Sequence, residues 1–341
     1  MKNVQKTLSR LWSSYSFIVI FAVIFIFYWF ASSGLTWGGT TNILRHSAVI
    51  GLIALGEGLV IITGEIDLSV GSMMAFVAGF SVVVFNATQS AALTLLFALV
   101  CGGLCGLLNG VLVGVAKMPS FIVTLATMLI YRSLAQYICQ QMDTALTGGG
   151  NSLFKMSREI GGYDLLYGFG NGKLLTVPNV GWVLLVFTVG CVYLATSTKF
   201  GKKLYAIGSN EKAARLAGIH VPLNRTVVFA LCGVMVGLGA FLWICMNGSA
   251  DPATSGSSYE MYAIAAVVLG GISMSGGKGR TVGILFGAMS YTIIDKIIVA
   301  LKMDSLINDT IKGVILIVAI LVQTAGPEIK AKVQGLRKEK A

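Results

Sequence analysis

Carboxylate side chains interrupt the apolar sequence at two neighbouring places. Glu57 lies between two glycines inside an apolar run, and the segment GEIDLSVGS (residues 64–72) places Glu65 and Asp67 between two further runs. Charged side chains are costly in lipid, so those within membrane spans face water, a partner or a substrate path. Asp67 has a second interpretation, as the cap of a helix that begins near Ser69. Both interpretations fit the residues.

Four further charges fall inside apolar runs and pose a similar choice. They are Arg132, Asp295, Lys296 and Lys312. Each suits either a helix–helix contact or the wall of a water-filled path.

A second polar break, GGISMSGGKGR (residues 270–280), resembles a phosphate-binding loop only superficially. Such a loop needs G-x-x-x-x-G-K followed by Ser or Thr. Aligned on Gly277 and Lys278, the segment has Ile272 in place of the first glycine and Gly279 in place of the hydroxyl residue. The chain therefore contains no recognisable ATP site.

Metal and redox chemistry have no support in the sequence. The 6 cysteines all fall in apolar runs without a CxxC pair, and the 2 histidines, His46 and His220, are far apart. Zinc sites and membrane-embedded enzymes both need such residues gathered at one place. We therefore expect no metal site, no catalytic residue and no cofactor bound by this chain.

The composition requires a membrane environment. Of the 341 residues, 55% are hydrophobic and 11% are charged, and the mean hydropathy is +0.82. Soluble domains average about 25% charged residues, so this chain cannot cover a surface that faces water. Apolar runs of about twenty residues suit membrane helices and not barrel strands. The predicted fold class is all-α, a polytopic helical protein in the lipid bilayer.

The net charge of +11 is explained by basic residues that concentrate on one side of the membrane, and it does not indicate a nucleic-acid partner. Most lysines and arginines fall on one side if the N-terminus is cytoplasmic, which is the positive-inside distribution. This predicts about 10 transmembrane helices with both termini in the cytoplasm, or eight if the segments after residues 64 and 275 are re-entrant. The predicted spans are 15–33, 42–63, 69–86, 91–115, 119–141, 179–197, 225–247, 258–275, 281–301 and 308–325.

The chain reads as one transmembrane domain over residues 1–341, with its spans within about 15–325. A basic cytoplasmic tail follows at 326–341, and a cytoplasmic loop occupies 198–224. The outer segment 142–178 is rich in glycine and is expected to lack a clear core.

The cytoplasmic loop contains a short predicted helix. Asn210 is suited to its N-cap and Glu211 to its first turn, Ala213 and Ala214 favour helix, and Gly218 is suited to its end. Such a helix can dock on a partner protein, or the basic loop can lie on anionic lipid. The residues support either interpretation.

Four segments together resemble a known family. They are GEIDLSVGS (64–72), PSFIVTLATM (119–128), FGKKLYAIGSNEKAARLAGI (200–219) and YEMYAIAAVVLGGISMSGGKG (259–279). In this order and spacing they resemble the membrane permease subunits of the ribose, xylose, arabinose and galactose ABC importers. The similarity runs from about residue 40 to residue 325.

The resemblance implies a permease subunit in a bacterial plasma (inner) membrane, working as a homodimer or as a heterodimer with a second permease subunit. It would receive a monosaccharide from an extracytoplasmic sugar-binding protein. A separate cytoplasmic ABC ATPase would bind ATP-Mg and hydrolyse ATP, so this chain would be no enzyme. The implied ATPase-coupling residues are Asn210, Glu211, Ala213, Ala214 and Gly218. Residues assigned to the translocation path are Glu57, Asp67, Ser69, Ser275, Gly276 and Gly277.

One position departs from the general importer pattern Glu-Ala-Ala-x-x-x-Gly. Lys212 occupies the Glu position and Glu211 stands one residue earlier, which puts the expected polar contact in question. The alternative function is an ion-gradient-driven secondary transporter with broken helices, which explains both breaks but gives the loop helix no task.

Overall fold

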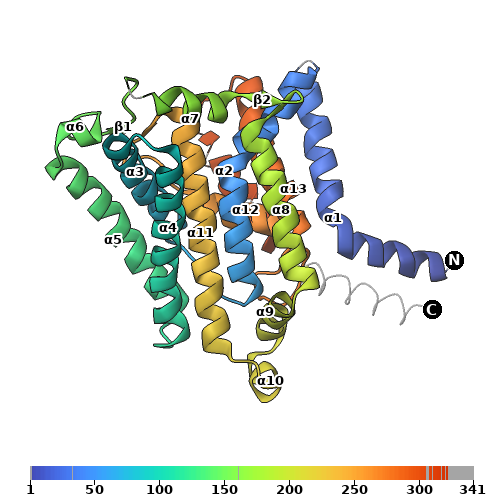
Figure 1. Ribbon diagram of the computed structural model, residues 1–341. Helices are drawn as coiled ribbons and strands as arrows, with labels where there is room; N and C mark the ends of the chain where they lie inside the picture. The colour runs from blue at the N-terminus through green and yellow to red at the C-terminus, as the bar shows by residue number, and fades with distance from the viewer. Residues whose placement is uncertain are drawn as a thin grey trace.

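The computed structural model describes residues 2–321 apart from 33, 160, 305, 306, 309, 316 and 319, with side chains from residue 17 onward. Its regular structure is almost entirely helical (Figure 1). The helices are α1 (Lys2–Ala31), α2 (Trp37–Ile62), α3 (Val70–Thr88), α4 (Ala91–Gly114), α5 (Ser120–Gln141), α6 (Thr144–Thr147), α7 (Gly162–Asn171), α8 (Asn179–Ser197), α9 (Lys199–Ser209), α10 (Glu211–Leu216), α11 (Val221–Asn247), α12 (Tyr259–Leu269) and α13 (Val282–Ala300). The short strands are β1 (Phe154–Lys155), β2 (Lys173–Leu174), β3 (Val177–Pro178) and β4 (Ser249–Ala250).

Of the described helices, 7 are long and apolar enough to cross a membrane, namely α2, α3, α4, α5, α8, α11 and α13. The all-α polytopic class is therefore confirmed. The apolar part of α1, Phe17–Ala31, and α12 are shorter. Helix covers only part of the predicted span 258–275, because α12 ends at Leu269 and glycine-rich turns follow. The predicted span 308–325 lies partly, and the tail 326–341 wholly, outside the described residues.

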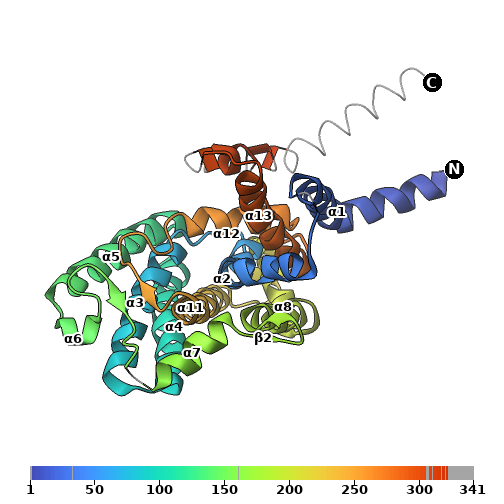
Figure 2. The ribbon, with the colours of Figure 1, turned by 90° about the horizontal axis from the view of Figure 1, so that it is seen from above.

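Helix α2 forms the centre of the bundle. Its most apolar window is 89% buried, against 22% for that of α4. A helix that is apolar on all sides is stable only when neighbours surround it. Helices α8, α11, α12 and α13 pack against α2, and Figure 2 shows it between them. Its last turns therefore carry Glu57 into the protein interior.

The two ends of the bundle differ. Helices α9 and α10 lie at one end, together with both sequence breaks; we call this the α10 end (bottom of Figure 1). Helices α6 and α7 and strands β1 to β3 lie at the other, the α7 end. The segment 142–178, which was expected to lack a clear core, buries apolar side chains here. Strand β1 pairs antiparallel with β4, and the Phe154 ring is fully buried against Gly79 of α3.

Glycines allow α4 and α11 to pack closely along most of their length. Gly102, Gly106 and Gly110 recur every four residues on one face of α4. Gly102 and Gly106 meet Gly233 of α11, and Gly110 meets Thr226 of the same helix. A Cβ atom on Gly233 would overlap the carbonyl oxygen of Gly102. In lipid, where apolar burial does not drive association, such close backbone contact is a main source of helix–helix affinity.

Replacing Gly233 with Leu should force α4 and α11 apart and destabilise the fold by about 1–3 kcal/mol or more. Thermal unfolding of the purified protein in detergent would measure this as a lower midpoint. Gly190→Leu is the matched control, because Gly190 lies on an exposed face of α8 with open space around it. Equal midpoints for the two variants would contradict the packing argument.

Candidate functional site

The two breaks in the sequence meet at the α10 end. The backbone N–H of Gly277 donates to the carbonyl oxygen of Ile62, at 2.9 Å, so the second break satisfies a carbonyl at the end of α2. Gly64 and Gly276 lie side by side with φ of +85° and +77°, a region that favours glycine. The two breaks are therefore in direct contact.

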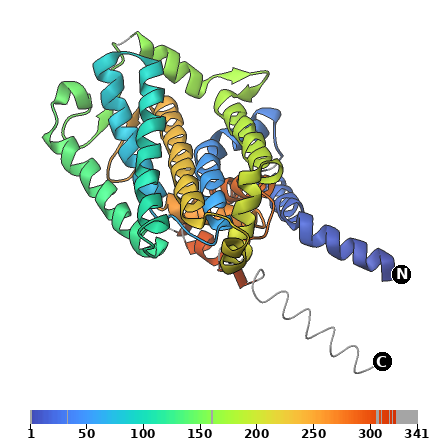
Figure 3. The same ribbon diagram turned by 60° about the horizontal axis from the view of Figure 1, so that its bottom comes forward.

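Helix α9 closes the same contact from a third side. A Cβ atom on Gly208 would overlap the carbonyl oxygen of Ile62, so the end of α9 lies directly against the end of α2. The Ser209 hydroxyl donates to the Gly277 carbonyl at 3.2 Å, and the Tyr205 hydroxyl donates to that of Gly279 at 3.0 Å. We call this meeting point the break junction; Figure 3 brings this end forward. It comprises Ile62, Gly64, Gly208, Ser209, Gly276 and Gly277.

A buried polar cluster lies next to the break junction. Glu57 Oε1 accepts the backbone N–H of Asp67 at 3.0 Å. Asp67 Oδ1 accepts both the backbone N–H and the hydroxyl of Ser69, at 2.8 and 2.6 Å. Asn109 of α4 donates to Asp67 Oδ2 and to the Ser69 hydroxyl, at 3.3 and 2.9 Å. All four side chains are fully buried, so the cluster has no contact with the surrounding medium in this conformation.

The predicted path residues thus divide into two groups. Glu57, Asp67 and Ser69 belong to the buried cluster, whereas Gly276 and Gly277 belong to the break junction and Ser275 is exposed beside it. The cap interpretation of Asp67 is wrong in its geometry, because the N-cap of α3 is Ser69, which makes no side-chain cap bond. The Asp67 carboxylate instead accepts the N–H of Ser69 two residues on, which is a turn that precedes the helix. The sequence did not point to Asn109, which is polar but uncharged within a long apolar run.

The predicted loop helix is confirmed as α10. Asn210 Oδ1 accepts the backbone N–H of Ala213 at 3.0 Å, and Gly218 has φ of +79° just beyond the helix. Ala214 is buried in a small cluster with Ile207 of α9 and Val221 of α11. Its methyl group therefore packs α10 against the rest of the permease. The outward face presents Lys212, Ala213 and Leu216, and Leu216 is 92% exposed.

Arg225 of α11 joins α10 to the first break. Its Nη2 lies 2.8 Å from Glu65 Oε1 and 2.7 Å from Glu211 Oε2. Glu211 also binds Arg215 one turn along α10, at 2.6 Å. The hydrogen bond from Arg215, with support from Arg225, holds the pKa of the Glu211 carboxyl below its ordinary value. Sequence reasoning missed Arg225, because Glu65 is distant from it in the chain.

Three of the four further charges within apolar runs, Arg132, Asp295 and Lys312, find partners in the fold. Arg132 of α5 donates to the carbonyl oxygens of Pro252 and Ser255, at 3.0 and 2.7 Å, just before α12. Asp295 of α13 pairs with Lys312 at 2.6 Å. Among the described residues, no group of His, Cys, Asp and Glu is arranged to hold a metal ion.

Replacing Asn109 with Leu should leave the buried Asp67 carboxylate short of a donor and lower stability by about 1–3 kcal/mol. Thermal unfolding in detergent would report the loss. Asn247→Leu is the matched control, since Asn247 is exposed and its amide donates only to a carbonyl of its own helix, α11. A loss no greater than that of the control would show that the Asn109 amide does not support Asp67.

Comparison with known proteins agrees with this architecture. Residues 39–320 match the family model described as "Branched-chain amino acid transport system / permease component". The ribose import permease protein RbsC of Escherichia coli is 35% identical over 283 residues, which cover 82% of this chain and 84% of that protein.

Two further relatives extend the comparison. RbsC of Bacillus subtilis is 35% identical over 281 residues, covering 82% of this chain and 83% of its own. The autoinducer 2 import system permease protein LsrC of Yersinia enterocolitica is 34% identical over 278 residues, covering 81% and 72%. No solved structure matches the chain.

The family match spans most of the chain, and these relatives cover more than two thirds of it. The resemblance carried by the four sequence segments is therefore confirmed. The chain is a multi-pass protein of the bacterial inner membrane, and it belongs to the family of transport-system permease components that this model describes.

Proposed function

We propose that this permease forms the membrane path for a monosaccharide in an importer driven by a separate ATPase. The observation that carries the proposal is the contact of α9 with both breaks at the break junction, together with the link from α10 to the first break through Arg225. A partner that moves α10 would move the two places where the membrane helices are interrupted. A secondary transporter would give α10 no such task.

In the proposed orientation the α10 end lies in the cytoplasm. The α9–α10 region carries Lys199, Lys202, Lys203, Lys212 and Arg215, and such a basic concentration is typical of cytoplasmic loops. Both termini then lie in the cytoplasm. About 10 membrane crossings follow if α1, α12 and the last apolar stretch are counted with the long helices.

Helix α10 is the proposed docking element for the ATPase. Leu216 projects an apolar side chain into the surrounding medium, with Lys212 and Ala213 beside it. Glu211 forms ion pairs with Arg215 and Arg225, so it holds α10 to the permease and does not face the partner. Magnesium-bound ATP belongs to the ATPase in this proposal, and the permease binds no cofactor.

Coupling requires two conformations whose balance the ATPase shifts. A docked partner changes this balance only through contacts that differ between the two states. Arg225 supplies a contact of this kind, because it binds the docking helix through Glu211 and the first break through Glu65. Movement of α10 is thereby passed to the segment that carries Asp67.

The proposed substrate is a monosaccharide, because RbsC of two bacteria is a ribose import permease and both cover most of this chain. A sugar-binding protein outside the cell would deliver it to the α7 end. A second permease subunit, identical or related, would complete the path. Co-expression with a candidate ATPase and a binding protein, followed by reconstitution in liposomes, tests the whole assembly.

Uptake in those liposomes should require ATP, the ATPase and the sugar-loaded binding protein. Uptake by the permease alone, driven by an ion gradient and insensitive to ATP, would overturn the proposal in favour of a secondary transporter.

Gly218→Trp should reduce ATP-driven uptake about tenfold, a loss of about 1.4 kcal/mol in effective docking. The residue stands beside α10 with open space around it, so a large side chain obstructs a partner without disturbing the permease itself. Gly218→Ala, which carries the same backbone strain without the bulk, is the control. Equal uptake by both variants would remove the docking role.

Arg225→Gln should lower uptake several-fold while ATP hydrolysis continues, because α10 then docks but no longer moves the first break. Arg215→Gln is the matched control, since Arg215 binds Glu211 but does not reach Glu65. The ratio of sugar imported to ATP hydrolysed is the measurement. If both variants keep the wild-type ratio, the Arg225 bridge does not transmit the movement.

A further inference from the structure

Helix α12 begins inside the bundle and covers only part of the path between its two ends. It has 11 residues and starts after Ser258, whose φ is +62°. The turns before it, at residues 251–258, are held by Arg132 of α5 through the carbonyl oxygens of Pro252 and Ser255. The first turn of α12 faces the middle of α13, at Tyr291. Interrupted helices that begin near the membrane centre are where transporters place their substrates.

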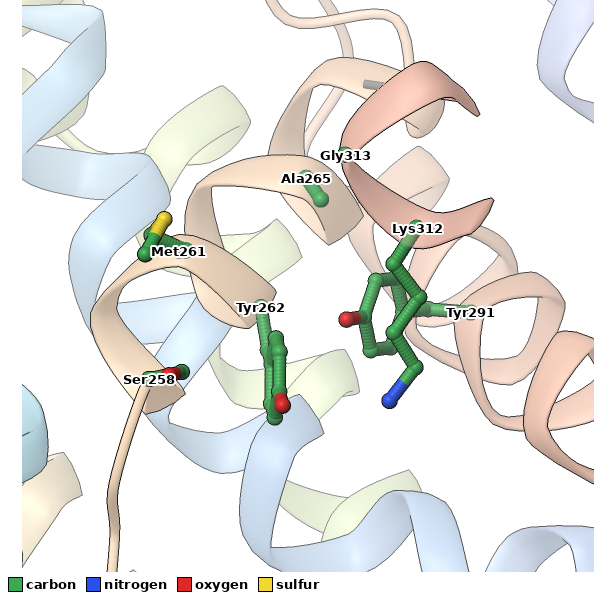
Figure 4. Close-up of a pocket in the computed structure, with 7 residues that line it drawn as sticks. All are labelled: Ser258, Met261, Tyr262, Ala265, Tyr291, Lys312 and Gly313. Carbon is green, nitrogen blue, oxygen red and sulfur yellow. The ribbon is translucent and has the colours of Figure 1, made fainter. Parts of the chain in front are cut away.

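A small pocket opens beside this helix start (Figure 4). Its volume is about 120 Å³, which exceeds the space needed by a single water molecule several times over. α12 and the residue before it form most of its wall, α13 adds Tyr291, and the helical segment 310–315 closes one side. The lining residues are Ser258, Met261, Tyr262, Ala265, Tyr291, Lys312 and Gly313.

Two aromatic rings and an ion pair define the chemistry of the pocket. The ring centroids of Tyr262 and Tyr291 lie 5.0 Å apart at 36°. The Lys312 ammonium lies 4.4 and 4.9 Å from these centroids, and it pairs with Asp295 at 2.6 Å. Lys312 is 6% exposed, so the cation is held inside the protein. Ionisable residues kept at such depth commonly mark a substrate path.

This combination suits a neutral polyhydroxylated ring better than other small ligands. The flat aromatic faces can pack on the C–H side of a sugar, and an ammonium–carboxylate pair offers a donor and an acceptor to its hydroxyl groups. An organic cation would meet the charge of Lys312, which already occupies the aromatic faces. A purely apolar ligand would leave the Lys312–Asp295 pair without new hydrogen bonds.

We propose that the pocket formed by Tyr262, Tyr291 and Lys312 is a monosaccharide-binding site on the transport path. It rests on the proposed function, which identifies the substrate class but no contact residue. In this site the sugar packs against the tyrosine rings, and Lys312 moves from the rings to a sugar hydroxyl while it remains near Asp295. Met261, which is 54% exposed, stands at the mouth.

The first experiment uses the complete importer in liposomes, with D-ribose, D-xylose and D-galactose as probes at saturating sugar-loaded binding protein. Tyr262→Leu and Lys312→Met should each lower uptake about 3–10-fold, while the stimulated ATPase rate stays near that of the wild type. Tyr262→Phe, which keeps the ring, should restore most of the uptake. Lys296→Met is the control, because Lys296 neighbours Asp295 in sequence but does not line the pocket.

A second measurement does not depend on transport. Met261→Cys is introduced in the assembled importer, and its modification by a charged thiol reagent is followed by the mass of its peptide. The transported sugar should slow the reaction several-fold, and the slowing should disappear when Tyr262→Leu is added. Modification at an unchanged rate with the sugar present would overturn the site, whatever the state of the uptake variants.

The two proposals fail in different ways. If the wild-type assembly transports none of the three sugars, both the proposed function and the proposed site are rejected. If the wild type transports a sugar but Tyr262→Leu and Lys312→Met match Lys296→Met, the permease function stands and the pocket is not a sugar site.

Discussion

Backbone carbonyls that end a helix inside a membrane protein must find donors within the protein, and this constraint organises the α10 end. The carbonyl of Ile62 has no further turn of α2 to satisfy it, and the N–H of Gly277 supplies the bond. That bond brings the two breaks together, and the absence of a side chain at Gly208 lets α9 approach the same carbonyl. The elements that a partner would push are consequently in direct contact with the elements that interrupt the membrane helices.

Charges inside the bundle follow the same constraint. Arg132 satisfies carbonyls that the turns before α12 leave open, Asp295 pairs with Lys312, and Glu57 accepts the N–H of Asp67. Arg132 and Glu57 therefore stabilise places where regular helix stops, whereas the Asp295–Lys312 pair joins two helical segments. The interruptions that transport needs are the places where the fold concentrates its buried hydrogen bonds.

Much of the fold follows from the sequence, because apolar runs of span length admit only helices in lipid. Asn210 and Gly218 also predict both limits of α10, since capping depends on local backbone chemistry. The polar break at 270–280 was recognised, but the predicted span 258–275 overlaps it and ends the helix too late, because Ile272 and Met274 continue the apolar pattern beyond Leu269. The bridge from Glu65 through Arg225 to Glu211, and the pocket around Tyr262, depend on contacts between distant parts of the chain that no local pattern records.

Arg225 serves two carboxylates with a single nitrogen, Nη2, and this sharing has a consequence for energetics. That nitrogen carries two N–H groups and holds both carboxylates at once, at 2.8 and 2.7 Å. Two negative charges share one cation, so neither carboxylate can be displaced without changing the electrostatic environment of the other. The bridge draws the first break and α10 toward one point, and a force on either of them is felt by both.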